Sequence, residues 1–281
     1  MGRFDGVLLA SDFDNTLIYT EEALRSGRPV PPLSAGNRAA LESFMAQGGR
    51  FTVATGRALP AFERLAPLVP MNAPCVVCNG AAIYDFKKSE YLETALLPAQ
   101  SRERGQEVLD AFPRVGVEAY HLDSVIHAVQ VNHIIRAHEH LTGVRVRALP
   151  RLTEAPLPLS KLLFESEHRD LVQAEEFIRS RDWAAEYELI YSGKTLLELT
   201  AKGADKGGML CRLAAHLGIA PEHVYAVGDE RNDLTMLAWA SQGFAPANCV
   251  PDVAHCGARL VCDARGDALA EVIAALEERY S

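Results

Sequence analysis

The fold is decided by the stretch Val7-Leu8-Leu9-Ala10-Ser11-Asp12-Phe13-Asp14-Asn15-Thr16-Leu17. Its four apolar residues after Gly6 predict a short strand that is buried on both faces. Asp12 and Asp14 then stand at the carboxyl end of that strand, where open α/β sheets bind their ligands. Two carboxylates about 4 Å apart repel each other by roughly 4 kcal/mol at an effective dielectric constant of about 20. An isolated pair could simply cap a turn, but the rest of the chain favours a ligand site.

Two later stretches repeat this pattern of an apolar strand with polar residues at its end. Phe51–Ala54 leads into Thr55-Gly56-Arg57, and Val224–Val227 leads into Gly228-Asp229-Glu230-Arg231-Asn232-Asp233. A parallel sheet would bring these strand ends together, and Lys206 would join them from the start of a helix that Asp205 caps. Several converging carboxylates need a cation. Mg²⁺ fits best, because it binds carboxylates, a backbone carbonyl, waters and a substrate phosphate.

Such a site suits phosphoryl transfer. An aspartate beside Mg²⁺ can attack phosphorus, and a second carboxylate held off the metal can protonate the leaving oxygen and later deprotonate water. The equatorial phosphate oxygens then require a hydroxyl, an ammonium and backbone N–H groups. Thr55, Lys206 and the Asn15-Thr16 turn offer them.

The organisation of the chain changes near residue 83 and changes back near residue 202. Strands alternate with helices before and after, whereas residues 83–201 show shorter strands and two helical patterns, over 102–112 and 168–179. Short strand-like pieces at 128–131, 162–164 and 196–199 favour an antiparallel α+β unit. We therefore expect a parallel-sheet α/β domain of residues 1–82 plus 202–281, with an inserted α+β domain of residues 83–201.

The composition is that of a globular protein and excludes some partners. With 281 residues, 48% hydrophobic residues and a formal charge of −9, the chain offers no basis for a broad nucleic-acid or anionic-membrane surface. Its start lacks the layout of a signal peptide, and no apolar run approaches the roughly 20 residues that span a bilayer. Six cysteines without dense spacing fit a reducing compartment, so we expect a cytoplasmic protein. Cys75 and Cys78 are expected to be small core residues.

The motifs, in this order, resemble those of the haloacid dehalogenase superfamily of aspartate-nucleophile phosphotransferases. Asp12-Phe13-Asp14-Asn15-Thr16-Leu17 is similar to the first motif, Thr55-Gly56-Arg57 to the second, Lys206 to the third, and Gly228 to Met236 to the fourth. The insertion resembles, in placement and size, the α/β cap of the Cof-like branch (type IIB). The resemblance thus implies a Rossmann-like core and an inserted cap domain.

The resemblance also implies roles for individual residues. Asp12 would be the nucleophile and a Mg²⁺ ligand, Asp14 the general acid/base with its backbone carbonyl on the metal, and Asp229 the main further ligand. The phosphate would be held by Thr55, Gly56, Asn232 and Lys206, and Asp233 would order the metal ligands. Residues implied as substrate contacts are Arg57, Asn79, Gly80 and Asn248.

Three positions carry alternatives. Lys202 competes with Lys206 for the third motif, and we prefer Lys206 because it starts a helix. Arg57 could reach the substrate or pair with an acid, and the two are equally favoured. Asn15 stands where the family usually has Gly, and Asn tolerates a left-handed backbone.

The function expected is a Mg²⁺-dependent phosphatase of a small phosphorylated metabolite, with a sugar phosphate favoured. A sugar-phosphate mutase would keep the same motifs, and a non-catalytic phosphometabolite-binding protein would keep the fold. Haloalkanoate dehalogenation is disfavoured, because it has no use for Asp14 or a metal. His133, His138 and His140 fall in the insertion without matched carboxylates, so we expect them to be solvated or satisfied histidines rather than metal ligands.

Overall fold

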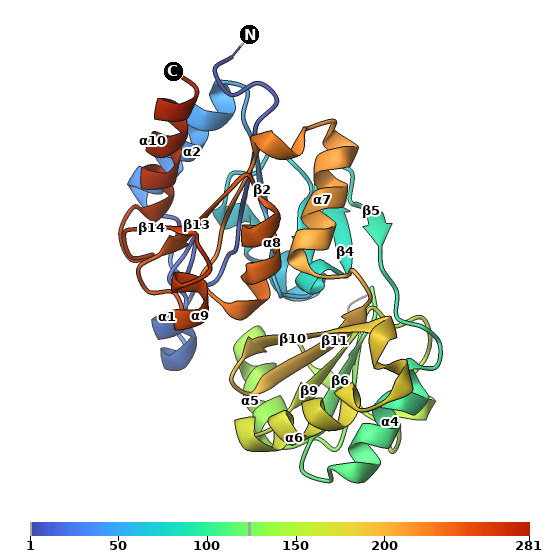
Figure 1. Cartoon of the computed structure of the whole chain (residues 1–281). Coiled ribbons are helices and arrows are strands. Elements are labelled where there is room, and N and C mark those ends of the chain that lie inside the picture. Colours follow the sequence, from blue (N-terminus) through green and yellow to red (C-terminus); the bar gives the residue numbers. More distant parts are fainter. Residues whose placement is uncertain (1, 123–124) are drawn as a thin grey trace.

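The computed structural model describes residues 2–122 and 125–281, and these form a parallel-sheet unit and a second α+β unit (Figure 1). Residues 1, 123 and 124 fall within the predicted domain ranges but lie outside the described residues. The first sheet is parallel, with the order β14-β13-β12-β1-β2. Its strands are β1 (Leu8–Ser11), β2 (Arg50–Val53), β12 (Val224–Val227), β13 (Gln242–Pro246) and β14 (Arg259–Val261). The predicted α/β class is confirmed.

Strand β1 lies in the middle of this sheet and is buried on both faces, as its apolar run predicts. Leu9 packs in the core cluster that includes Phe44 and Val272, while Leu8 packs in another with Met209 and Leu213. Helices therefore cover both sides of the sheet (Figure 1). One side is covered by α2 (Ala35–Ala46) and α10 (Ala268–Arg279), and the other by α7 (Lys206–Leu217) and α8 (Leu234–Trp239).

Local sequence signals fix where the long helices start. The Ser34 side chain accepts a hydrogen bond from the backbone N–H of Asn37 at the start of α2, and Asp205 accepts one from Gly208 at the start of α7. α7 ends at Gly218, which adopts the left-handed conformation. The short helices of this unit are α1 (Glu21–Ser26), α3 (Leu59–Phe62) and α9 (Pro251–Ala254).

A small antiparallel sheet of β3 (Cys75–Val77), β4 (Ala82–Asp85) and β5 (Glu90–Thr94) adjoins the first sheet through a parallel bridge between Ala54 and Val76. Ile83 belongs to the same core cluster as the buried residues of α7. The boundaries of the two domains stay a prediction, and this packing favours a start of the insertion after β5 rather than at residue 83.

The second unit is built on a six-stranded sheet of order β10-β11-β9-β6-β7-β8, antiparallel except for the β7–β8 pair. Helices α4 and α6 cover one face, packing on Val117, Leu162 and Phe164. The elements are α4 (Ser101–Ala111), α5 (His133–Thr142), α6 (His168–Arg179), β6 (Gly116–Tyr120), β7 (Ile126–Val129), β8 (Val146–Ala148), β9 (Lys161–Glu165), β10 (Tyr187–Gly193) and β11 (Leu196–Ala201).

The opposite face of this sheet carries the alternate residues, and we call it the roof face. The register pairs Glu118 with Leu163 and Leu163 with Glu198, so these side chains share it. The roof face includes Glu118, Tyr120, Ile126, Ala128, Lys161, Leu163, Glu165, Leu196 and Glu198.

The sequence predicted much of the second unit but missed one helix. Helices α4 and α6 and strands β9 and β11 lie where their patterns indicated, whereas β7 begins and ends two residues earlier than predicted and α5 was not predicted.

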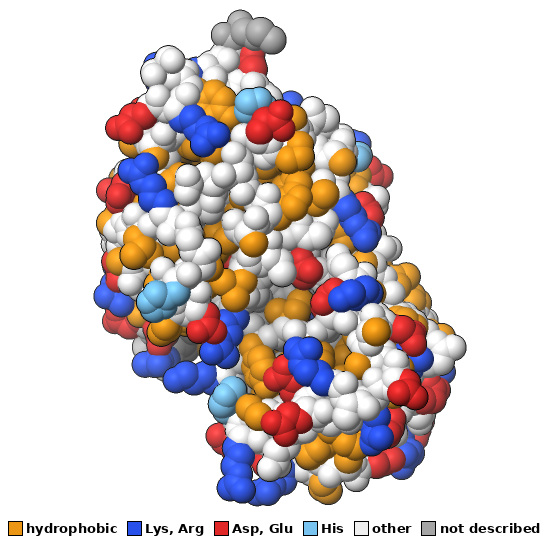
Figure 2. All heavy atoms as spheres, viewed as in Figure 1, with side chains coloured by type: hydrophobic (Ala, Val, Ile, Leu, Met, Phe, Trp, Pro, Cys, Tyr) orange, Lys and Arg blue, Asp and Glu red, His pale blue; other side chains and the backbone are white. Residues whose placement is uncertain are grey.

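None of the described helices is long and apolar enough to cross a membrane. On the face seen in Figure 2, acidic and basic side chains are interspersed.

Candidate active site

The ends of β1 and β12 bring three carboxylates together. The register pairs Ser11 with Val227, so Asp12 and Asp229 follow their strands at nearly the same level. Carboxylate oxygens of Asp12, Asp229 and Asp233 all lie within 4.8 Å of one another, and the three residues are buried. The structure therefore brings together the acids that the strand-end argument selected.

Lys206 is the cation within this cluster. Its Nζ lies 2.6 Å from Asp12 Oδ1 and 2.6 Å from Asp233 Oδ1, and its side chain is fully buried. Lys202, the competing candidate, pairs with Glu188 at 2.9 Å and is mostly exposed. The position of Lys206 at the first turn of α7 turns its ammonium toward the strand ends, as predicted.

One ammonium does not balance three carboxylates. Burial raises the pKa of Asp12 to about 7 although Lys206 opposes it, and burial with the charges of Asp12 and Asp233 raises the pKa of Asp229 to about 9. Burial acts to lower the pKa of Lys206, but the two aspartates paired with it outweigh burial and raise that pKa. The cluster thus favours an additional positive charge.

The donor set of this cluster fits a hard divalent cation. Carboxylate oxygens are the ligands that Mg²⁺ prefers, and the Thr16 hydroxyl orients Asp229 by donating to its Oδ1 at 2.6 Å. Asp233 Oδ2 accepts hydrogen bonds from the backbone N–H groups of Asp229 and Glu230, at 2.9 and 3.0 Å. Asp233 therefore shapes the loop that presents Asp229, as expected for a residue that orders the ligands.

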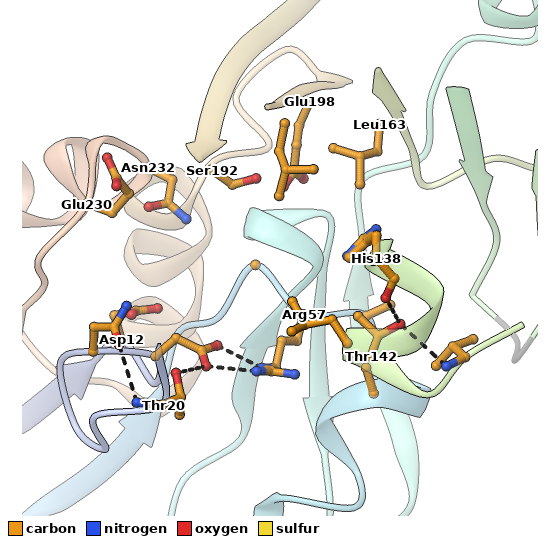
Figure 3. Close-up of a pocket in the computed structure, with 18 of the residues that line it drawn as sticks. Asp12, Thr20, Arg57, His138, Thr142, Leu163, Ser192, Glu198, Glu230 and Asn232 are labelled. Carbon is orange, nitrogen blue, oxygen red and sulfur yellow. Dashed lines mark hydrogen bonds and ion pairs between the residues drawn. The ribbon is translucent and has the colours of Figure 1, made fainter. Parts of the chain in front are cut away.

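Asp14 turns away from this cluster and forms a bidentate ion pair with Arg57. The Arg57 Nε lies 2.7 Å from Asp14 Oδ2 and Nη2 lies 2.8 Å from Oδ1, and Thr20 donates to Oδ1 at 2.6 Å (Figure 3). Burial acts to raise the pKa of Asp14, but Arg57 and Thr20 outweigh it and hold that pKa below its ordinary value. Of the two alternatives for Arg57, the structure shows pairing with an acid.

Asn15, the residue that follows Asp14, adopts the conformation that its type permits. Asn15 has φ of 56°, in the left-handed region, and its Oδ1 accepts hydrogen bonds from the backbone of Thr20 and Glu21 at 3.3 and 3.1 Å. The expectation that Asn replaces Gly here without difficulty agrees with this geometry.

A cavity of about 380 Å³ lies between these strand ends and the roof face. Asp12, Asp14 and Asp229 line its core side, together with Gly56, Arg57 and Asn232. Figure 3 shows His138, Leu163, Ser192 and Glu198 around the same cavity. Its second-unit side combines polar residues, among them Thr142 and Lys161, with the apolar or aromatic residues Tyr120, Ile126, Leu141, Val144, Leu163 and Leu196.

Several predicted site residues lie outside the cavity lining. Thr55 is buried and its Oγ1 accepts a hydrogen bond from the Arg57 N–H at 3.1 Å. Gly80 has φ of 97° and its Cα packs so close to the Asp205 backbone that a Cβ would clash. Asn248 donates to the backbone oxygen of Asn15 at 2.8 Å and so supports the first loop.

Asn79 also lies outside the lining, in a buried chain of contacts that sequence reasoning missed. It accepts from Asn232 at 2.9 Å and donates to Glu198 at 2.6 Å. Glu198 pairs with Lys161 at 2.8 Å, and Lys161 donates to the Gly56 oxygen at 3.2 Å. This chain joins the roof face to the core strand ends. No local signal could have found it, because Lys161 and Glu198 meet through strand pairing.

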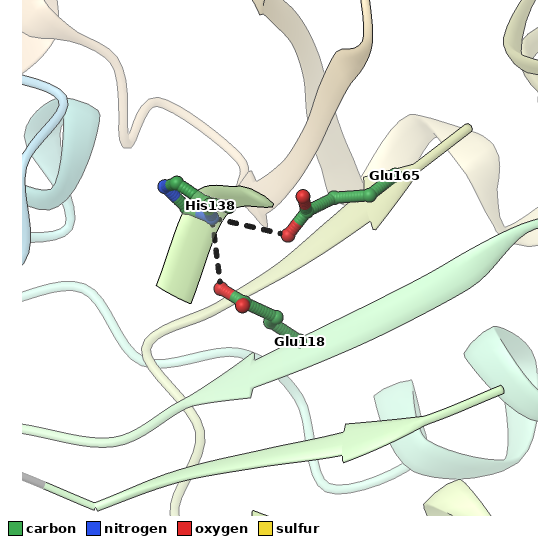
Figure 4. Close-up of side chains that lie close together, drawn as sticks. All are labelled: Glu118, His138 and Glu165. Atoms are coloured by element: carbon green, nitrogen blue, oxygen red, sulfur yellow. Dashed lines mark hydrogen bonds and ion pairs between the residues drawn. The ribbon is translucent and has the colours of Figure 1, made fainter. Parts of the chain in front are cut away.

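The expectation for the histidines is wrong in one respect. His138 does have matched carboxylates: its Nδ1 lies 3.2 Å from Glu165 Oε1 and 3.3 Å from Glu118 Oε2 (Figure 4). Burial acts to lower the pKa of His138, but its contacts with the two glutamates outweigh burial and raise that pKa to about 10. For Glu165, burial acts in the other direction and raises the pKa to about 7. The cluster could not be predicted from a local pattern, because its three residues lie far apart in the sequence, on β6, α5 and β9.

Comparison with known proteins identifies the family to which this chain belongs. The family model for haloacid dehalogenase-like hydrolases matches residues 9–273. An HMP-PP phosphatase of Serratia proteamaculans (strain 568) is 28% identical over 257 residues, covering 88% of this chain and 85% of the relative. A pyridoxal phosphate phosphatase of Escherichia coli (strain K12) is 24% identical over 275 residues, covering 95% and 97%.

The fold has solved counterparts as well. A sugar phosphatase of subclass IIB of the same superfamily superposes with a TM-score of 0.79 at 18% identity, covering 96% of this chain and 99% of that one. At that identity the likeness concerns the fold, including its inserted unit. The family predicted from the four motifs is confirmed.

Proposed function

The chain belongs to the haloacid dehalogenase-like hydrolase family and is a phosphoric monoester hydrolase, and on this premise we propose that it dephosphorylates a small metabolite through an aspartyl phosphate on Asp12. The observation that carries the proposal is the position of Asp12: it lines the cavity, and Lys206 at 2.6 Å stabilises its ionised form. A protein that only binds a phosphorylated metabolite would not need two carboxylates, Asp12 and Asp14, together in the lining of one cavity.

The proposed reaction has two steps. In the first, a carboxylate oxygen of Asp12 forms a bond to phosphorus, the bond from phosphorus to the ester oxygen breaks, and Asp14 gives its proton to that oxygen. In the second, water attacks the phosphorus of the aspartyl phosphate, its proton passes to Asp14, and the bond from phosphorus to the Asp12 oxygen breaks, which releases inorganic phosphate. Asp12 and protonated Asp14 are then restored.

Arg57 is the residue that sets the protonation of Asp14 in this scheme. Its two hydrogen bonds favour ionised Asp14, which is the form needed to accept a proton from water. Protonation for the first step requires this ion pair to loosen. The cavity position of Arg57 allows an anionic substrate to compete with Asp14 for the guanidinium.

We propose that Asp12, the Asp14 backbone carbonyl and Asp229 hold Mg²⁺, with Asp233 and Thr16 orienting Asp229. When bound, the ion neutralises the carboxylates and the phosphate oxygens and so favours attack by an anionic nucleophile. The excess of buried carboxylates over ammonium groups supports this proposal.

Two substrate classes are candidates. The sequence favours a sugar phosphate, as in the structural relative of subclass IIB. The apolar patch of Ile126, Leu141 and Val144 favours an ester with a flat heterocycle instead, because sugar hydroxyls placed against this patch would lack hydrogen-bond partners. The two phosphatases reported above act on HMP-PP and on pyridoxal phosphate, according to their names.

A panel of phosphate esters with Mg²⁺ tests the proposal. We expect release of inorganic phosphate, loss of activity with EDTA and recovery on adding Mg²⁺. A kcat/KM higher for heterocyclic esters would favour the second class. Transfer of the phosphoryl group to another position of the product, without phosphate release, would instead identify a mutase. Hydrolysis that persists in EDTA would contradict the metal assignment.

A further inference from the structure

The roof face carries a second cluster of ligating side chains, apart from the strand ends of the core. Glu118 extends from β6, Glu165 from β9 and His138 from α5, and the three side chains point toward one another (Figure 4). We propose that these residues bind a divalent transition-metal ion, such as Zn²⁺ or Mn²⁺. This site is separate from the one formed by Asp12 and Asp229.

The spacing of the donor atoms matches a metal coordination shell. Metal–ligand bonds of about 2.0–2.2 Å to nitrogen and oxygen place neighbouring donors about 3.0–3.4 Å apart. The His138 Nδ1 lies 3.2 Å from Glu165 Oε1 and 3.3 Å from Glu118 Oε2, and one donor from each residue fits within 4.8 Å. The two distances from His138 therefore match those expected between ligands of one ion.

A buried oxygen points to the same ligand. Glu165 is fully buried, and its Oε2 has no hydrogen-bond partner among the described residues. An unpaired buried carboxylate oxygen is costly. Bidentate binding of the ion by Glu165, or a water bound to the ion, would satisfy this oxygen.

The charges around the cluster favour a divalent ion over a proton. The buried charged residues of the roof face are Glu118, Glu165 and Glu198 on the acidic side and Lys161 on the basic side. With all three carboxylates ionised, a protonated His138 would leave one net negative charge in this buried region. A divalent ion bound by neutral His138 would leave none.

The mixture of ligands selects the metal. An imidazole nitrogen with two carboxylates suits Zn²⁺ or Mn²⁺ and is poorly suited to Mg²⁺, which prefers oxygen. The Tyr120 hydroxyl donates to Glu118 Oε2 and so orients that carboxylate. Such supporting hydrogen bonds are typical of metal sites.

The ion would hold helix α5, which lines the cavity, in place against the sheet. Helix α5 supplies His138, Leu141 and Thr142 to the cavity lining, whereas Glu118 and Glu165 belong to the sheet behind it. A metal between them ties the helix to β6 and β9. The site is therefore structural, and it stabilises the part of the cavity that receives the non-phosphate end of the substrate.

Metal counting tests the proposal without any activity assay. The full chain carrying Asp229→Asn is dialysed against Zn²⁺ in the presence of excess Mg²⁺, which together suppress zinc binding at the all-oxygen site. We expect one Zn²⁺ per chain. Adding His138→Gln should reduce the count to below one tenth, whereas the matched control His140→Gln, an exposed histidine on the same helix, should keep one.

Two further measurements keep the test independent of folding. Zinc should raise the Tm of the Asp229→Asn protein and not that of the same protein with Glu165→Gln, a smaller change than loss of the imidazole. X-ray absorption should show a mixed nitrogen and oxygen shell. Equal zinc counts with and without His138, or an all-oxygen shell, would overturn the proposal and leave the phosphatase assignment untouched.

Discussion

Replacing Lys206 with Met tests how the carboxylate cluster is held. The change keeps an unbranched side chain that is one atom shorter and removes a buried ammonium that lies 2.6 Å from both Asp12 and Asp233. Breaking a buried ion pair by removing one partner costs roughly 3–5 kcal/mol. At about 2–4 °C per kcal/mol for a chain of this size, Tm should fall by roughly 6–20 °C.

Activity should fall too, because the same ammonium lies 2.6 Å from Oδ1 of Asp12, the proposed nucleophile. Loss of one preorganised donor of this kind lowers kcat by about 10²–10³. Mg²⁺ should raise the Tm of the Lys206→Met protein more than that of the wild type, because the ion would then be the cluster's remaining counter-charge.

Lys202→Met is the matched control. Lys202 stands four residues earlier, is mostly exposed and pairs with Glu188 at 2.9 Å. Exposed pairs contribute about 0–1 kcal/mol, so this variant should keep its Tm within a few degrees and its kcat unchanged. Thermal melts and steady-state phosphate release measure both proteins. If Lys206→Met melted and turned over like Lys202→Met, the electrostatic account of the cluster would be refuted.

Three further predictions concern other parts of the molecule. Asp14→Asn should lower kcat by about 10²–10⁴, with the smaller loss for esters of acidic alcohols, which need no proton from Asp14; equal losses across leaving groups would contradict the acid role. Thr16→Val removes the 2.6 Å hydrogen bond to Asp229 and should raise the Mg²⁺ concentration needed for half-maximal activity about 10-fold or more, measured by Mg²⁺ titration. Burial raises the pKa of Cys75 to about 12, and Cys78 is buried as well, so in the native protein both should resist a thiol reagent that labels exposed cysteines, with mass spectrometry locating the label.

The core site could be predicted from the sequence because each of its parts is local. Asp12 and Asp229 each follow a short apolar run, and parallel strands place such residues at one edge without any knowledge of pairing register, whereas Thr55 follows such a run and yet lies outside the cavity lining. Lys206 was predictable for a similar reason, because Asp205 marks where its helix begins.

The second unit could not be read in the same way. Glu118, His138 and Glu165 meet only because β6 pairs with β9 in one register and α5 covers that face. A shift of one residue in this pairing would put the two glutamates on opposite faces of the sheet. The sequence pattern likewise does not determine whether Arg57 pairs with Asp14, because both residues lie in loops whose side-chain directions it does not fix.

The most direct test of the central claim is to trap the covalent intermediate. The enzyme is mixed with a phosphate ester labelled at phosphorus, quenched in acid within one turnover, digested and analysed by mass spectrometry. We predict that the label is found on Asp12, and that Asp12→Asn, which keeps the fold by circular dichroism, carries none and has no turnover. A label on another residue, or near-normal turnover by Asp12→Asn, would contradict the account.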